Sequence, residues 1–140
     1  MNHEKYYIHF LAGLALSGCF RAPDQSAQER DSIAKLLEAY IGRYKSGDYG
    51  QVRFAADVTF ESPLTNGKIL GKRAVQKFLS EVHAKDVRVK RHIIDGQFAC
   101  VLADFETMEG TVVPFYEFFR VKGSEIAEIR PYFDPRPFIR

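Results

Sequence analysis

The sequence contains no tryptophan, has almost no net charge and shows no internal repeat or low-complexity stretch. The net charge of +2 is too small to indicate nucleic-acid binding by itself. The apolar run at residues 8–16 is too short to span a bilayer as a stable helix. No set of His, Cys and acidic residues has the spacing of a metal site, so we predict no metal and no other cofactor.

What the chain does have is enough apolar material for one domain. Its 140 residues are 46% hydrophobic and 14% aromatic, and 12 phenylalanines and 7 tyrosines take the place of the missing tryptophan. This length and composition predict a single globular domain with a real core.

The first nineteen residues have the composition of a signal sequence rather than of a domain. A short polar start with Lys5 precedes the apolar run, which ends in Leu16-Ser-Gly-Cys19. This ending resembles a bacterial lipoprotein lipobox, with Cys19 as the lipidated residue, and residues 20–27 then form a polar tether. The alternative is an amphipathic N-terminal helix of a cytoplasmic protein, with Cys19 as an ordinary buried thiol.

Lipidation at Cys19 would place the domain outside the cytoplasm and attach it to the membrane only through its lipid chains. The second cysteine, Cys100, would then have no disulfide partner. Because Cys100 lies in an apolar strand-like segment, we interpret it as a small hydrophobic residue without a catalytic role.

The order of the expected elements predicts an α+β fold. Helical periodicity and a capping box at Ser26-Ala-Gln-Glu29 indicate a helix to about residue 46, and the later segments alternate as strands do. Helices first and hairpin-linked strands afterwards predict an antiparallel sheet that covers the helices. The expected helices are 26–46, 48–56 and 71–84, the strands are 58–62, 86–95, 97–107, 111–122 and 125–133, Asn66-Gly67 is a hairpin turn, and the proline-rich tail 135–140 is extended.

Glu117 is the residue that fits its segment least. Alternation in a strand puts it on one face with Val113, Phe115, Phe119 and Val121. A carboxyl in such a setting is paired, protonated or exposed to a cavity, and acids in apolar surroundings are enriched at functional sites. The alternatives are an exposed strand edge or a buried Glu–Arg pair that only supports the fold.

The ordered set of motifs resembles the nuclear transport factor 2-like superfamily, which includes ketosteroid isomerase, SnoaL-like cyclases and limonene epoxide hydrolase. The resemblance covers about residues 28–138. It implies a cone-shaped, cystatin-like fold with an open apolar pocket, and commonly a dimer through the outer face of the sheet. The motifs are Tyr40-Ile41 followed by Gly47-Asp48, Phe54-Ala-Ala-Asp-Val-Thr-Phe-Glu-Ser-Pro63, Gly67 to Gly71, Phe119-Arg-Val121 and Ile126-Ala-Glu-Ile-Arg-Pro-Tyr-Phe133.

In ketosteroid isomerase, a helix tyrosine and a protonated acid form an oxyanion hole. The resemblance assigns these positions to Tyr40 and Glu117, but the position of the isomerase base is Ser62, which cannot move a proton alone. The acid that the epoxide hydrolase carries in its last strand is replaced by Pro131.

Two other acids could supply the base. SnoaL-like cyclases use an acid from the region of Asp134. Asp104 is the second candidate, because it is an acid on a strand face that is otherwise apolar. Arg91 shares an apolar face with its neighbours and could pair with Asp104 or Glu117 instead. His83 and His92 are expected to point outward. The basic residues at 72–91 are interpreted as a solvated surface, and no nucleic-acid partner is predicted.

Two functions remain open at this point. The first is an isomerase or cyclase that acts on an apolar carbonyl or polycyclic substrate, with Tyr40 and Glu117 donating to a developing oxyanion and Asp104 or Asp134 moving the proton. The second is a non-catalytic module that binds a small apolar ligand or a protein partner. A second carboxylate near the ligand would favour the enzyme. The expected pocket residues are Tyr40, Tyr44, Phe60, Ser62, Phe115, Glu117, Phe119, Ile129 and Phe133.

Overall fold

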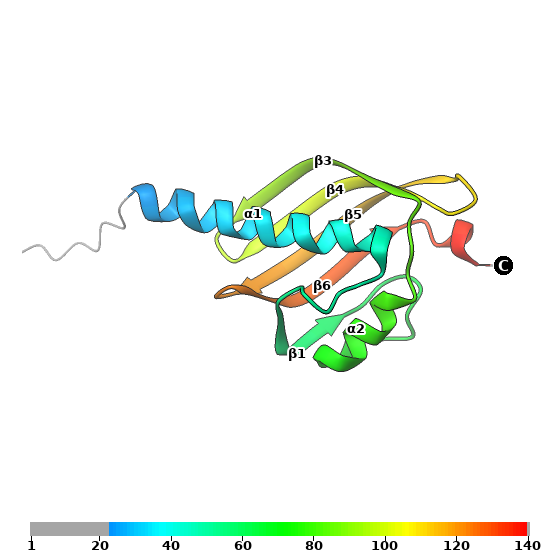
Figure 1. Ribbon diagram of the computed structural model, residues 1–140, viewed down its shortest axis with the longest axis horizontal. Helices are drawn as coiled ribbons and strands as arrows, with labels where there is room; N and C mark the ends of the chain where they lie inside the picture. The colour runs from blue at the N-terminus through cyan, green and yellow to red at the C-terminus, as the bar shows by residue number, and fades with distance from the viewer. Residues whose placement is uncertain (1–22, 140) are drawn as a thin grey trace, which may run out of the picture.

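The computed structural model describes residues 23–139, so the predicted signal, Cys19 and residues 20–22 of the predicted tether lie outside the described residues. Two α-helices, a six-stranded sheet and a short 3-10 helix make up this part of the chain, which confirms the α+β class (Figure 1). The elements are α1 Pro23–Ser46, β1 Phe54–Phe60, β2 Ile69–Leu70, α2 Lys72–Ser80, β3 Asp86–Asp95, β4 Phe98–Glu106, β5 Val112–Lys122, β6 Glu125–Phe133 and η1 Arg136–Phe138.

Helix α1 is the longest element and lies along one face of the sheet (Figure 1). It begins at Pro23, where proline is tolerated in a first helical turn, so residues 23–27 are helical rather than part of a tether. It ends before Gly47, whose φ of 69° permits an N–H donation to the carbonyl of Arg43 at 2.7 Å. None of the helices within residues 23–139 is both long and apolar enough to cross a membrane.

The sheet has the order β2-β1-β6-β5-β4-β3 and is mixed rather than fully antiparallel. Strands β3 to β6 form antiparallel neighbours, as the turn glycines between them predict. Strand β1 instead pairs in parallel with β6, and its other edge pairs antiparallel with β2 across the Asn66-Gly67 region. The expectation of an all-antiparallel sheet is corrected, because β1 and β6 belong to separate hairpins that meet side by side.

Two predicted local structures are wrong. Residues 48–56 do not form a helix, because Phe54 already pairs with Ile126 of β6 and pairing with that buried strand outweighs the weak helical preference of this segment. The tail is not extended either. Asp134 accepts a hydrogen bond from the backbone N–H of Arg136 at 3.0 Å, and η1 follows at once.

A register irregularity in β3 reverses the faces that simple alternation predicts. The irregularity lies between Val89 and Arg91, so His92 pairs with Val101 on the inner face and Ile93 is 52% exposed. Arg91 is exposed and His92 is partly buried. The expected placements of Arg91 among inward apolar residues and of His92 outside are both corrected.

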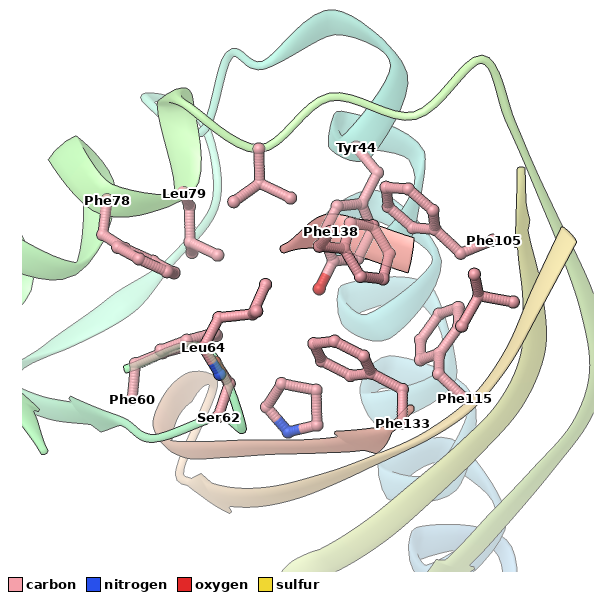
Figure 2. Close-up of a pocket in the computed structure, with 13 residues that line it drawn as sticks. Tyr44, Phe60, Ser62, Leu64, Phe78, Leu79, Phe105, Phe115, Phe133 and Phe138 are labelled. Carbon is pink, nitrogen blue, oxygen red and sulfur yellow. The ribbon is translucent and has the colours of Figure 1, made fainter. Parts of the chain in front are cut away.

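The core lies between α1, α2 and the inner face of the sheet. Residues Leu37, Tyr40 and Tyr44 of α1 are buried against it, and α2 adds Val75 and Leu79. On the inner face, alternate residues of β4 and β5 are buried while their neighbours are more exposed. This arrangement leaves an apolar core at the centre and an open end beside α2 and η1, where the candidate site lies (Figure 2).

Candidate functional site

A small cavity of about 60 Å³ lies at the end of the core next to the last turn of α1. Figure 2 shows side chains from α1, α2, the sheet and η1 converging on it. An apolar cavity of about 150 Å³ is known to hold benzene, so a ring-sized ligand here must displace a lining side chain or extend into the opening. The lining residues are Tyr44, Phe60, Ser62, Leu64, Phe78, Leu79, Val82, Phe105, Val113, Phe115, Pro131, Phe133 and Phe138.

Tyr44 and Ser62 are the two polar side chains in this lining. The Ser62 hydroxyl accepts a hydrogen bond from the Leu64 N–H at 3.2 Å, and its own N–H donates to Thr65 Oγ1 at 2.9 Å. Ser62 is therefore engaged in holding the turn. The Tyr44 hydroxyl points toward the middle of the lining side chains in Figure 2, which makes it the main polar group that a ligand would meet.

Behind Tyr44 lies a buried cluster that joins α1 to β5. The hydroxyls of Tyr44 and Tyr40 both donate to Oε1 of Glu117, at 2.8 Å and 2.9 Å. The two tyrosines are four residues apart in α1 and therefore share one face of the helix. Glu117 is 0% exposed, so it is not a solvated strand edge, and its hydrogen-bond partners among residues 23–139 are the two tyrosines rather than an arginine.

Burial raises the pKa of Glu117 from 4.5 to about 7, although the hydrogen bonds from Tyr44 and Tyr40 lower it. Burial, followed by the charge of Glu117, raises the pKa of both tyrosines well above 10. Near neutral pH the cluster therefore holds two protonated tyrosines and a carboxyl group that is present in both charge states.

Two polar atoms around this cluster have no hydrogen-bond partner within residues 23–139. They are Glu117 Oε2 and the hydroxyl of Tyr49, which are both buried. The Tyr49 ring packs against that of Tyr40 with 5.5 Å between centroids, and burial and then the Glu117 charge raise its pKa. Sequence reasoning missed Tyr49, because residues 48–56 were predicted as a helix, whereas Tyr49 lies in the irregular segment between α1 and β1.

The predicted site residues divide between the cavity wall and the core. Tyr44, Phe60, Ser62, Phe115 and Phe133 line the cavity, as expected. Tyr40, Glu117, Phe119 and Ile129 do not line it, because each is fully buried in the core.

The cavity also has lining residues that the sequence analysis did not select. Phe78 is three residues after the buried Val75 of α2, and Phe105 lies on the same alternating, buried face of β4 as Val101, so these two had a detectable signal. Phe138 did not, because η1 was unexpected.

The two candidate bases lie outside the cavity. Asp104 is on the outer face of the sheet, where the Lys90 ammonium lies 2.8 Å from its carboxylate. Asp134 is exposed and accepts from Arg136 Nε at 2.9 Å, and this hydrogen bonding lowers the pKa of Asp134 to about 2. The expected participation of Asp104 and Asp134 in pocket chemistry is thus corrected, since alternation turns the first outward and the second precedes η1.

Within residues 23–139, no three His, Cys, Asp or Glu side chains gather as a metal site requires. Of the described residues, the thirteen that line the cavity include no carboxylate. The arrangement can therefore hold an apolar molecule and offer it a phenol oxygen.

Comparison with known proteins identifies the fold and the family. The family model described as "Domain of unknown function (DUF4904)" matches residues 28–140, and no curated protein matches the chain. Solved structures that resemble it include a nuclear transport factor 2-like protein of unknown function from Cytophaga hutchinsonii, with a TM-score of 0.63, 20% identity and coverage of 75% of this chain and 92% of that one.

Two further structures agree with this assignment. A nuclear transport factor 2-like protein of unknown function from Burkholderia xenovorans has a TM-score of 0.67 and 15% identity, covering 79% of this chain and 95% of that one. A hypothetical protein with a ketosteroid isomerase-like fold from Catenulispora acidiphila, solved with trimethylamine, has a TM-score of 0.60 and 17% identity, covering 71% and 85%. The chain belongs to the DUF4904 family and has the nuclear transport factor 2-like fold.

Proposed function

We propose that this protein binds a small apolar ligand in the cavity, with the Tyr44 hydroxyl as the polar contact. The observation that carries this proposal is the composition of the wall, which is almost entirely carbon and includes no carboxylate among the described residues. A concave apolar site with few convergent polar groups is typical of small-molecule binding sites.

An isomerase or cyclase is less well supported by the same geometry. Proton transfer requires a base within hydrogen-bond reach of the substrate, directly or through one water. Glu117 is sealed behind Tyr44, and Asp104 and Asp134 are engaged by Lys90 and Arg136 away from the cavity. The proposal therefore selects the binding module of the two functions that the sequence leaves open.

The mouth of the cavity provides the test. Leu64 is 39% exposed and lines the cavity, whereas Leu70 is 66% exposed on β2 and does not line it. Replacing Leu64 with tryptophan should narrow the opening and weaken binding of a small cyclic alcohol at least tenfold, while Leu70→Trp should leave it unchanged. Isothermal titration calorimetry on the full chain, supported by chemical-shift changes, measures both.

Absence of saturable binding by cyclic alcohols and ketones to the unmodified chain would contradict the proposal. An equal loss of binding affinity in Leu64→Trp and Leu70→Trp would also contradict it, because the ligand would then not enter past Leu64.

We also propose that two copies associate through the outer face of the sheet. This face carries large side chains that are well exposed, namely Ile93 at 52%, Phe98 at 44%, Tyr116 at 54% and Tyr132 at 54%. Large apolar side chains exposed on one face mark interaction surfaces, and related folds commonly pair here.

Sedimentation velocity tests the dimer directly. The unmodified chain should sediment as a dimer at tens of micromolar, and Tyr116→Lys should shift it to monomer. Leu70→Lys, an equally large change on the β2 edge, should remain dimeric. A monomer at all concentrations, or dissociation by both variants alike, would refute this interface.

A further inference from the structure

We propose that Glu117 selects the ligand's polar group by holding the Tyr44 hydrogen away from the cavity. The site then accepts apolar molecules that carry a hydrogen-bond donor, such as a hydroxyl, in preference to matched carbonyl compounds. The inference rests on the proposed function, because it concerns the ligand of the same cavity.

The number of hydrogens on the Tyr44 hydroxyl limits what it can offer a ligand. A tyrosine hydroxyl has one hydrogen to donate and two lone pairs to accept with. Tyr44 and Tyr40 each direct that hydrogen to Glu117 Oε1, at 2.8 Å and 2.9 Å. Tyr44 is left with lone pairs alone for anything in the cavity, so its ligand must supply the hydrogen.

The geometry favours this direction of donation over the alternative. The two tyrosine hydroxyls are 3.3 Å apart, farther from each other than either is from the carboxylate oxygen. Hydrogen bonds to an ionised carboxylate are shorter and roughly twice as strong as neutral ones. A carbonyl ligand would have to draw the Tyr44 hydrogen away from a buried charge.

Protonation of Glu117 weakens this restriction. The neutral acid is a poorer acceptor, and its own hydrogen can be donated to a tyrosine oxygen, which frees the Tyr44 hydrogen to turn toward the cavity. Because Glu117 changes charge near neutral pH, the preference for a donor ligand should be strong in weakly alkaline solution and weaker in weakly acidic solution.

The groups around Glu117 allow the effect to be assigned to it. Helix α1 contributes Tyr40 and Tyr44, the segment after α1 contributes Tyr49, and burial raises the pKa of all three tyrosines.

The rest of the sheet adds two titratable groups. Cys100 of β4 is partly buried one residue from Val101, the cross-strand neighbour of Glu117, and its pKa is raised by burial and then by the Glu117 charge. On the other side of Glu117, β6 contributes Pro131, which carries no charge. In β3, His92 lies in the same cross-strand row two strands away, beyond Val101. Because it lies in this row, His92 requires its own control.

Cyclohexanol and cyclohexanone form a matched pair of probes, because they share a ring and only the alcohol can donate. Their dissociation constants are measured on the full chain by calorimetry at pH 8.5 and pH 5.5. We expect the alcohol to bind about fivefold more tightly at pH 8.5, as one neutral hydrogen bond implies, and the ratio of the two constants to approach one at pH 5.5. Using the ratio removes pH effects that are common to both ligands.

Three variants complete the test. Glu117→Gln should make the ratio of the two dissociation constants independent of pH, whereas His92→Gln should leave its pH dependence intact. Tyr44→Phe should still bind both probes, but with equal dissociation constants. A ratio that does not change with pH in the unmodified chain, or a ketone that binds more tightly at pH 8.5, would overturn the inference even if Glu117→Gln fails to fold. Failure of both probes to bind would instead refute the proposed function, and the inference with it.

Discussion

Replacing Glu117 with glutamine is expected to abolish a fall of about 3 kcal/mol in the free energy of unfolding between pH 4.5 and pH 7. In the unmodified chain the pKa of Glu117 is raised from 4.5 to about 7, and each pKa unit corresponds to about 1.4 kcal/mol. The folded state therefore binds this proton more tightly than the unfolded state. Stability from this group is fully present below pH 4.5 and is lost as the pH rises to about 7.

Urea denaturation at several pH values between 4.5 and 8 measures this effect. Arg136 lowers the pKa of Asp134 to about 2, so Asp134 also contributes to the free energy of unfolding. That contribution is lost mainly at pH values below the starting pH of the titration. Glu125→Gln is the matched control, because Glu125 is exposed at the start of β6 and its replacement should leave the slope unchanged. Equal pH dependence in the unmodified chain and in Glu117→Gln would show that Glu117 is not held as described.

The same linkage connects stability with the proposed site. Above neutral pH the protein holds a buried carboxylate that a well-packed apolar residue would replace without a desolvation cost. The two tyrosine donors offset only part of that cost, since the pKa of Glu117 stays raised despite them. An acid kept at this cost beside Tyr44, the one phenol among the described residues that line the cavity, supports a role in ligand choice.

Much of the fold follows from short-range patterns. The strands from β3 to β6 lie within two residues of their predicted bounds, because alternation sets each strand and glycines with positive φ, such as Gly96 and Gly123, form the turns. Glu117 is detectable for the same reason, since one acid interrupts an otherwise apolar strand face. The resemblance to the nuclear transport factor 2-like fold is confirmed by the solved structures.

The parts that could not be predicted depend on contacts between distant segments. The local pattern predicts a strand only from residue 58, whereas β1 begins at Phe54, where it pairs with Ile126 of β6. The irregularity in β3 moves His92 inward, and alternation alone cannot foresee an inserted residue. Periodicity also assigns a residue to a face without saying which end of that face reaches the cavity. Tyr40 and Tyr44 share one face of α1, yet Tyr44 alone lines the cavity, because the open end of the core begins one turn later.

Replacing Phe119 with alanine is expected to destabilise the domain by about 3–5 kcal/mol, the range for deleting a buried aromatic side chain. Phe119 is 0% exposed, and its ring lies edge-on to that of Tyr40 with 5.2 Å between centroids. The neighbouring Phe118 is the matched control, because it points to the outer face and stacks on Phe98 at 5.9 Å. Phe118→Ala should lower the free energy of unfolding by less than half as much as Phe119→Ala. Both variants are measured by urea denaturation under conditions where the chain is monomeric. Equal losses would contradict the assignment of the two faces of β5, and with it the placement of Glu117 behind Tyr44, because Glu117 and Phe119 share one face of that strand.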